Sequence, residues 1–225
     1  MPKSLETTPD HHVGEAQPKV IFVDWYKTLS NSLFWIDHPG TLLSSQELSR
    51  VTHSLFDDPK LIDSWMKGFT NSEAVSAEAA ARTNLDPDNI FQELVYSAQN
   101  MKLYDPEVLQ MIQAVRDQGR KVVLATDNMD TFERWTVAAL NLESVFDGII
   151  TSPSRGALKS EIQGDYSPFF GHYLSLNGIK PSEAVLVDDS SIDEVVMATG
   201  LGFRRVDHPN RLASILSGFL ETAEV

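Results

Sequence analysis

The sequence predicts an α/β protein in which a Rossmann-like parallel sheet carries an inserted helical cap subdomain. Short apolar runs rich in β-branched residues, such as Val20 to Val23, are typical of strands that are covered on both faces. From residue 104 onward these runs alternate with amphipathic helical patterns, which predicts right-handed βαβ units. Residues 31–103 carry helical patterns without a convincing strand, so we expect the inserted subdomain there.

The composition excludes several classes of protein. With 225 residues, 42% of them hydrophobic, the chain is long enough for one sizeable core and an insertion. The formal charge of −14 argues against nucleic acid or an anionic membrane surface as the main partner. Disulfides, thiolate zinc sites and cysteine nucleophiles are excluded because the chain has no cysteine. It shows neither a membrane-span pattern nor a signal-peptide pattern, so we expect a cytoplasmic protein; the sequence does not indicate its oligomeric state.

We expect three parts along the chain. Residues 1–18 lack apolar periodicity, which predicts a poorly ordered lead-in. Residues 19–30 and 104–225 form the α/β core, and residues 31–103 form the helical cap. Within the cap, helical patterns cover residues 45–56, 59–69, 72–83 and 88–98. Capping residues stand before three of these helices, namely Ser44 or Ser45, Asp58 and Asp86.

The core pattern gives the order of its strands and helices. We expect strands at residues 20–23, 121–125, 148–150, 184–187 and 202–206. We expect helices at residues 106–118, 131–140, 168–176, 192–199 and 211–221. Because parallel strands end at the same edge of a sheet, polar residues that follow different strands can converge on one site.

Polar side chains follow three of these strands. They are Asp24 with Thr28, then Thr126, Asp127 and Asn128, then Asp188, Asp189 and Asp193, and the candidate cation Lys159 lies between the last two groups. This set suits attack on a phosphoryl group, in which one carboxylate is the nucleophile and a second acid holds Mg²⁺. A hydroxyl and a lysine would bind the charged oxygens of the transition state. Two close carboxylates need the metal or the lysine to stay ionised.

Four segments in order resemble the haloacid dehalogenase (HAD) superfamily of hydrolases, and the resemblance covers nearly the whole chain. The family's first motif, D-x-D-x-T, is similar to the segment from Asp24 to Thr28. Its second, an apolar strand ending in Thr or Ser, is similar to the run that ends at Thr126, and its third, a lysine, is matched by Lys159. Its fourth, a strand ending in an acidic pair, resembles 185–189 with Asp193 a turn later. The inserted helices resemble the family's cap, which closes over the site and selects the substrate.

The resemblance implies roles for the matched residues. The catalytic residues would be Asp24 as the nucleophile, with Thr126 and Lys159 on the phosphoryl oxygens. The ligands of Mg²⁺ would be Asp24, Asp189 and the backbone carbonyl of Tyr26, supported by Asp188 and Asp193. The residues in contact with a small phosphorylated substrate would be Thr28, Asn128, Trp25 and Tyr26.

Position 26 departs from the family's phosphatases, in which a second Asp acts as general acid and base. Tyr26 is a poor proton shuttle at neutral pH because the ordinary pKa of a phenol is about 10. The family's 2-haloacid dehalogenases also carry tyrosine there, since halide leaves as an anion. They have uncharged Ser and Asn in place of Asp188 and Asp189, however, so the acidic pair favours magnesium-dependent phosphoryl chemistry.

Several alternatives stay open. Besides the phosphatase, the same nucleophile could hydrolyse a carbon–halogen or carbon–phosphorus bond, or the chain could be a weakly active or inactive member that binds a phosphorylated ligand or a protein. Thr126 could cap the next helix, and Asp193 could stabilise the first turn of its own helix. Trp25, Phe34 and Trp35 either line the substrate pocket or pack the cap onto the core.

Overall fold

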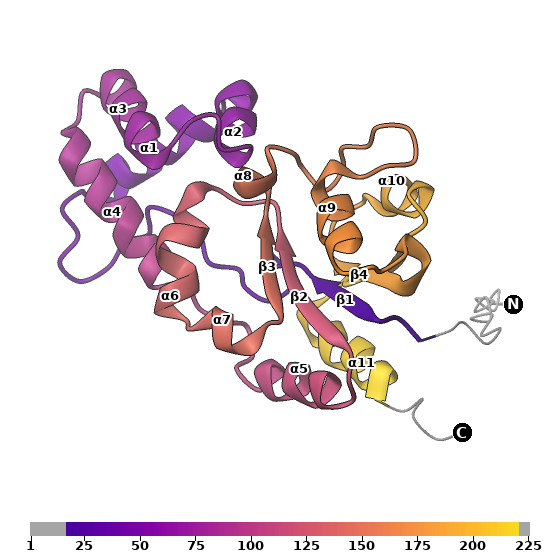
Figure 1. Ribbon diagram of the computed structural model, residues 1–225. Helices are drawn as coiled ribbons and strands as arrows, with labels where there is room; N and C mark the ends of the chain where they lie inside the picture. The colour runs from indigo at the N-terminus through magenta and orange to yellow at the C-terminus, as the bar shows by residue number, and fades with distance from the viewer. Residues whose placement is uncertain (1–16, 221–225) are drawn as a thin grey trace, which may run out of the picture.

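The computed structural model describes residues 17–220, which form a five-stranded sheet covered by helices (Figure 1). The strand order is β3-β2-β1-β4-β5, and all neighbouring pairs are parallel. The strands are β1 (Val20–Val23), β2 (Lys121–Thr126), β3 (Gly148–Thr151), β4 (Ala184–Asp188) and β5 (Gly202–Arg205). The predicted α/β class and parallel sheet are confirmed. Most of the lead-in expected for residues 1–18 lies outside the described residues.

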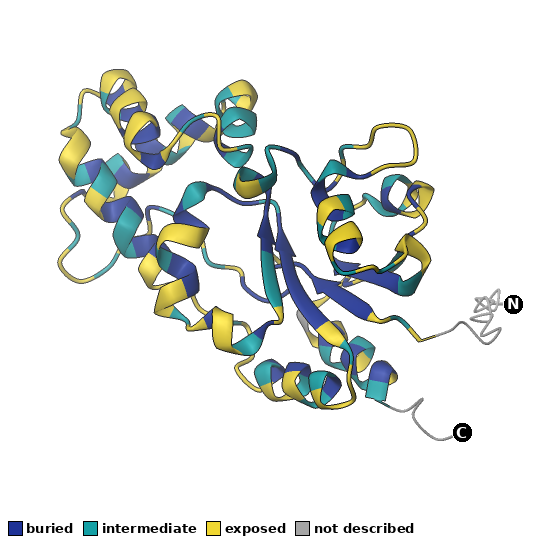
Figure 2. Ribbon diagram, in the orientation of Figure 1, coloured by how far each residue is buried: buried dark blue, intermediate teal, exposed yellow. Residues whose placement is uncertain are grey.

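β1 lies at the centre of the sheet because it is apolar at every position. Side chains alternate along a strand, so Ile21 and Val23 pack into one hydrophobic layer and Val20 and Phe22 into the other. All four are fully buried. Figure 2 shows that the strands are mostly buried and that the helices around them are exposed on their outer sides.

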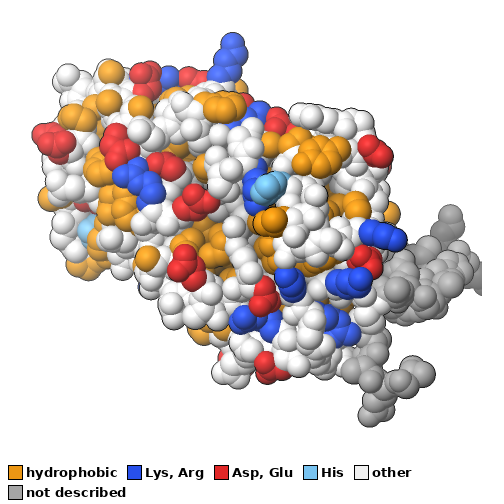
Figure 3. Space-filling model, viewed as in Figure 1, with side chains coloured by type: hydrophobic (Ala, Val, Ile, Leu, Met, Phe, Trp, Pro, Cys, Tyr) orange, Lys and Arg blue, Asp and Glu red, His pale blue; other side chains and the backbone are white. Residues whose placement is uncertain are grey.

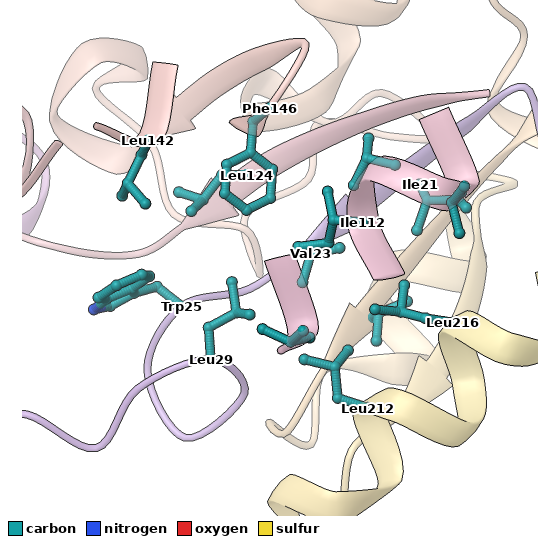
Figure 4. Close-up of a cluster of buried hydrophobic side chains, with 14 of the residues drawn as sticks. Ile21, Val23, Trp25, Leu29, Ile112, Leu124, Leu142, Phe146, Leu212 and Leu216 are labelled. Atoms are coloured by element: carbon teal, nitrogen blue, oxygen red, sulfur yellow. The ribbon is translucent and has the colours of Figure 1, made fainter. Parts of the chain in front are cut away.

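Helices cover both faces of the sheet. On one face lie α5 (Val108–Asp117), the π-helix η1 (Phe132–Thr136), α6 (Val137–Ala139), α7 (Leu142–Val145) and α11 (Pro209–Leu220). On the other face lie α9 (Pro168–Leu176) and α10 (Asp193–Ala198). In Figure 4, Ile112 of α5 and Leu216 of α11 project toward Ile21 of β1. No helix within residues 17–220 is both long enough and apolar enough to cross a bilayer.

Some boundaries differ from the prediction. The helix expected at 106–118 begins at Val108, whose amide donates to the carbonyl of Asp105 in a 3₁₀-type bond (3.2 Å). The helix expected at 131–140 is instead the π-helix followed by α6, and the Thr136 hydroxyl in it donates to the carbonyl of Ala98 (2.8 Å). The four-residue helices α7 and α8 (Ser152–Arg155) were not predicted, because so short a segment shows no helical period.

Four helices follow one another between β1 and α5. They are α1 (Ser45–Phe56), α2 (Pro59–Met66), α3 (Ser72–Thr83) and α4 (Pro87–Gln99). The predicted caps are confirmed, since the side chains of Ser44, Asp58 and Asp86 each accept a hydrogen bond from the first turn of α1, α2 and α4. These helices enclose a hydrophobic cluster of their own, which includes Trp35 and Trp65. Figure 1 shows them beside the sheet rather than on either of its covered faces.

Gly68 brings the end of α2 against the core. Its φ of 72° is in the left-handed region that favours glycine, and this ends the helix at Met66 rather than at residue 69. A Cβ atom at this position would lie 2.9 Å from the carbonyl oxygen of Pro153 in α8. The backbones of the helical section and the core can approach this closely only because residue 68 has no side chain.

Asp130 fastens the helical section to the core from the other side. Its carboxylate follows β2 and accepts hydrogen bonds from the Trp65 indole (2.6 Å) and from the Ser72 amide (3.2 Å) and hydroxyl (2.6 Å). It also forms an ion pair with Arg134 at 2.9 Å. Since Trp65 is fully buried, its N–H group depends on this acceptor.

We expect Asp130→Asn to lower the free energy of unfolding by about 1–3 kcal/mol. The asparagine side chain has an NH₂ group in place of one carboxylate oxygen, and this group cannot accept the hydrogen bonds that Trp65 and Ser72 now donate. Urea denaturation monitored by tryptophan fluorescence measures this change. The matched control is Glu78→Gln, which alters an exposed pair with Arg82 within α3 and should change stability by no more than about 0.5 kcal/mol. Equal effects of the two variants would show that Asp130 does not fasten the helices.

Candidate active site

Asp24 and Asp188 lie side by side at the ends of neighbouring strands. Val23 and Val187 are partners in the parallel register, so the next residues on β1 and β4 are also opposite each other. The Asp24 amide donates to the carbonyl of Val187 at 3.0 Å and holds this alignment. β2 and β4 flank β1 on opposite sides, and ligands of open α/β sheets bind where the strand order reverses in this way.

Lys159 brings its ammonium between these two carboxylates. Nζ lies 2.7 Å from Asp24 Oδ1 and also donates to Asp188 Oδ2, and all three side chains are buried. Asp127 positions the lysine, because its carboxylate accepts the Lys159 backbone N–H at 3.0 and 3.3 Å. Sequence reasoning did not assign this role to Asp127, although its place directly after Thr126 was a signal. Ser190 was also missed; its amide and hydroxyl both donate to Asp188.

The buried charges shift one another's pKa values. Burial raises the pKa of Asp24 to about 7, with Lys159 opposing the shift and Asp188 adding to it. Burial alone would lower the pKa of Lys159, but the carboxylates of Asp24 and Asp188 outweigh it and raise this pKa. For Asp188, burial raises the pKa, yet Lys159 and Ser190 reverse the shift and leave it lowered. Asp188 is therefore the ionised partner of Lys159, and Asp24 is the carboxyl group that takes up a proton more readily.

Asp189 completes a group of three carboxylates. Oxygens of Asp24, Asp188 and Asp189 all lie within 4.8 Å of one another, which is compatible with shared coordination of one cation. Asp189 is half-buried and forms no ion pair within residues 17–220. Burial and the neighbouring Asp188 raise its pKa. A hard divalent cation suits this all-oxygen set of donors.

The predicted hydroxyl and amide groups lie at the same strand ends. Thr126 is fully buried, and its hydroxyl makes one long contact with the Asp127 carbonyl (3.4 Å) rather than capping the following helix. Thr28 is buried too, and its Oγ1 has no hydrogen-bond partner among the described residues. Ser152 holds the backbone of Asn128: its hydroxyl accepts a hydrogen bond from the Asn128 backbone N–H (3.0 Å) and donates one to the Asn128 backbone carbonyl (3.0 Å).

The residues after Asp24 turn the chain away from β1. Lys27 adopts a left-handed φ of 61°. Trp25 is buried in the core against Phe132, with ring centroids 5.1 Å apart, whereas Tyr26 remains 37% exposed. The structure does not gather Asp193 into the carboxylate group; Asp193 forms an ion pair with Arg205 at 2.7 Å.

A cavity of about 680 Å³ lies between the helical section and these strand ends. Trp25, Tyr26, Asp127 and Asn128 line it from the core side, directly after Asp24 and Thr126 in sequence. The rest of the lining is partly apolar, with Leu33, Phe34, Trp35, Ile36, Leu48, Phe56, Met66, Met101 and Met129, and partly polar, with Ser32, Asp37, Ser45, Ser49, Thr52 and His53. Trp25, Phe34 and Trp35 therefore fulfil both roles left open by the sequence, since they line the cavity and also belong to, or pack against, the core clusters.

No protein-family model matches the sequence, and no curated protein matches it. The chain is similar in structure to a predicted HAD-like hydrolase from Porphyromonas gingivalis, with 15% identity over 92% of this chain and 99% of that chain and a TM-score of 0.64. A HAD family enzyme from Bacteroides thetaiotaomicron in complex with magnesium and inorganic phosphate matches with 15% identity over 84% and 93% and a TM-score of 0.57. L-2-haloacid dehalogenase from Xanthobacter autotrophicus matches with 16% identity over 92% and 85% and a TM-score of 0.60. The chain therefore has the HAD fold, as its sequence predicted.

Proposed function

We propose that the protein is a magnesium-dependent hydrolase that uses Asp24 to remove the phosphoryl group from a small phosphorylated metabolite. The observation that carries this proposal is an imbalance of charge. Four carboxyl groups, those of Asp24, Asp127, Asp188 and Asp189, lie around Lys159, and the ammonium of Lys27 also acts on Asp189, so the carboxyl groups outnumber these two ammonium groups. Close carboxylates cannot all be ionised unless further positive charge joins them. A divalent cation provides it.

The residues present fit Mg²⁺. Asp24 and Asp189 offer carboxylate oxygens within the 4.8 Å group, and the backbone carbonyl of Tyr26 is a third candidate ligand close by in sequence. Asp188 would stay with Lys159, which it already binds. When bound, the metal supplies positive charge to the phosphoryl oxygens.

The chain's own residues then divide the reaction between them. A carboxylate oxygen of Asp24 would attack phosphorus, the ester P–O bond would break, and water would later hydrolyse the aspartyl-phosphate. Lys159 already lies 2.7 Å from the attacking carboxylate and would stabilise charge on the phosphoryl oxygens. The buried hydroxyls of Thr126 and Thr28 are available as further donors.

The proposed partner is a small molecule rather than nucleic acid or a membrane. The net charge of −14 disfavours both polyanionic surfaces. On the face drawn in Figure 3, several basic side chains lie toward the lower right, and acidic side chains lie among them.

Carbon–halogen hydrolysis is the second candidate, and Tyr26 favours it because the family's dehalogenases carry the same residue. Lys159 also balances part of the charge without a metal. Against this candidate stands Asp189, a half-buried carboxylate with no ion pair among the described residues. A 2-haloacid would bring one more negative charge to this site.

We expect the purified protein to hydrolyse 4-nitrophenyl phosphate with Mg²⁺ and to lose this activity in EDTA. Asp24→Asn should lower kcat by about 10³-fold or more, since it removes the nucleophile. Asp117→Asn, an equivalent change at the exposed end of α5, should leave kcat unchanged. Full activity in a folded Asp24→Asn protein would refute the proposal, and chloride release from 2-chloropropionate without metal would favour the second candidate.

The raised pKa of Asp24 predicts that Mg²⁺ binding strengthens with pH. In the metal-free fold, a pKa of about 7 lies above the unfolded value of 3.8, so this group's contribution to stability is present below pH 3.8 and is lost as the pH rises through 7. Mg²⁺ must displace the proton, so its apparent affinity should rise roughly 30-fold between pH 5.5 and 8.5. The Mg²⁺-induced increase in Tm, measured at both pH values, should grow accordingly and should flatten in Asp24→Asn. A shift in Tm that is independent of pH would contradict this prediction.

Tyr26→Asp tests the missing proton donor. A carboxyl group at this exposed position should raise kcat for an alkyl phosphate such as ethyl phosphate by about 10²-fold, because an alkoxide must be protonated as it leaves. The gain for 4-nitrophenyl phosphate should be small. Tyr26→Asn, which removes the phenol without adding an acid, is the control. If both variants raise alkyl phosphate turnover equally, the phenol hinders the substrate and the acid is irrelevant.

A further inference from the structure

The cavity is built to hold an apolar group. Its lining is mostly aromatic, aliphatic and methionine side chains from both the core and the helical section. A volume of about 680 Å³ is within the range of pockets that enclose a small organic ligand. Phe34 and Trp35 line the cavity, and both pack against Trp65 with ring centroids 6.0 and 6.2 Å apart. The thioethers of Met66, Met101 and Met129 adapt readily to a flat ring.

The charges around the cavity disfavour an anionic occupant. None of its lining residues, all of which belong to the described part of the chain, is lysine or arginine. The ionisable groups in the lining are Tyr26, the imidazole of His53 and the carboxyl groups of Asp37 and Asp127, and these two carboxylates would repel a second phosphate or a carboxylate. A sugar bisphosphate or a 2-haloacid would therefore place its extra negative charge next to like charge.

Within residues 17–220, the indole N–H of Trp25 is an unpaired polar group in a residue that lines the cavity. Trp25 is 1% exposed, and its Nε1 has no hydrogen-bond partner among the described residues. Figure 4 shows this nitrogen at the end of the ring farther from Leu29 and Val23, and the residue also lines the cavity. Buried N–H groups are almost always paired, so the group points to an acceptor oxygen on the ligand.

Tyr26 limits the leaving group. It stands where a general acid is needed and lines the same cavity. Without an acid, the P–O bond breaks readily only if the departing oxygen is a stable anion, and a phenolate is far more stable than an alkoxide. An aromatic ring attached to that oxygen is also the group that the cavity favours.

We propose that the substrate is a phosphate monoester of a neutral aryl alcohol whose ring occupies this cavity. The inference rests on the proposed function and names its substrate class. An oxygen of Asp24 forms the new bond to phosphorus, the aryl O–P bond breaks, and its electron pair leaves on the aryl oxygen as phenolate. The phenolate then takes a proton from water. Hydrolysis of the aspartyl-phosphate restores Asp24 and releases phosphate.

The test compares three substrates with the Mg²⁺-loaded protein. 1-Naphthyl phosphate carries a neutral ring, 4-carboxyphenyl phosphate an anionic ring, and acetyl phosphate no ring at all. We expect kcat/KM for the naphthyl ester to exceed that for the carboxyphenyl ester by about tenfold or more. No preference for the neutral ring overturns the inference. Asp24-dependent hydrolysis of acetyl phosphate would then show that the proposed function still holds, whereas loss of all phosphatase activity would overturn both.

A pair of variants ties the preference to the cavity. Ser49 lines its mouth from α1 and is exposed, so Ser49→Trp should fill the space without disturbing the core. Gln46→Trp adds the same side chain to an exposed position of α1 that does not line the cavity. Ser49→Trp should lower the naphthyl-to-acetyl ratio of kcat/KM by about tenfold, and Gln46→Trp should leave it unchanged. An unchanged ratio in a folded Ser49→Trp protein overturns the inference.

Discussion

The ammonium of Lys159, held between the buried carboxylates of Asp24 and Asp188, constrains the rest of the site. A buried charge is tolerated only with partners, and removing one partner of such a pair costs about 3–5 kcal/mol. The two strands must therefore end in register, and the loop that carries Lys159 must return to the same edge. The Asp127 carboxylate, which accepts the Lys159 amide, secures that return. The carboxyl groups gathered at this edge of the sheet therefore outnumber the ammonium groups of Lys159 and Lys27.

Much of this arrangement was predictable because it depends on local patterns. The apolar runs located all five strands, and the parallel topology then brought Asp24, Thr126 and Asp188 to one edge. The capping residues gave helix starts in the inserted section to within a residue. The predictions that failed also concerned local structure. The π-helix and the two four-residue helices are too short to show a helical period in the sequence.

Contacts between distant segments could not be predicted from the sequence. Asp130 resembles an ordinary turn residue until Trp65 and Ser72 are placed beside it, far away in the chain. Gly68 likewise gave no sign that Pro153 would lie against it. The cavity was the hardest feature to predict. Its lining residues, such as Trp25, Leu48 and Met129, come from three separate segments, and only their combination in space makes the cavity mostly apolar. Asp193, which we predicted near the metal, instead forms an ion pair with Arg205 of β5.

The cavity also gives a physical reason for the tyrosine at position 26. A carboxyl group facing aromatic and methionine side chains would be poorly solvated in its ionised form, and the neighbouring Asp24 and Asp189 would raise its pKa further. Such an acid would stay protonated, which is the form that donates to a leaving alkoxide and the form that an aryl leaving group does not need. A phenol, by contrast, extends the aromatic lining and adds no charge to an edge that already has an excess of carboxylates. The apolar cavity and the absent acid therefore both favour a substrate whose leaving group departs without help.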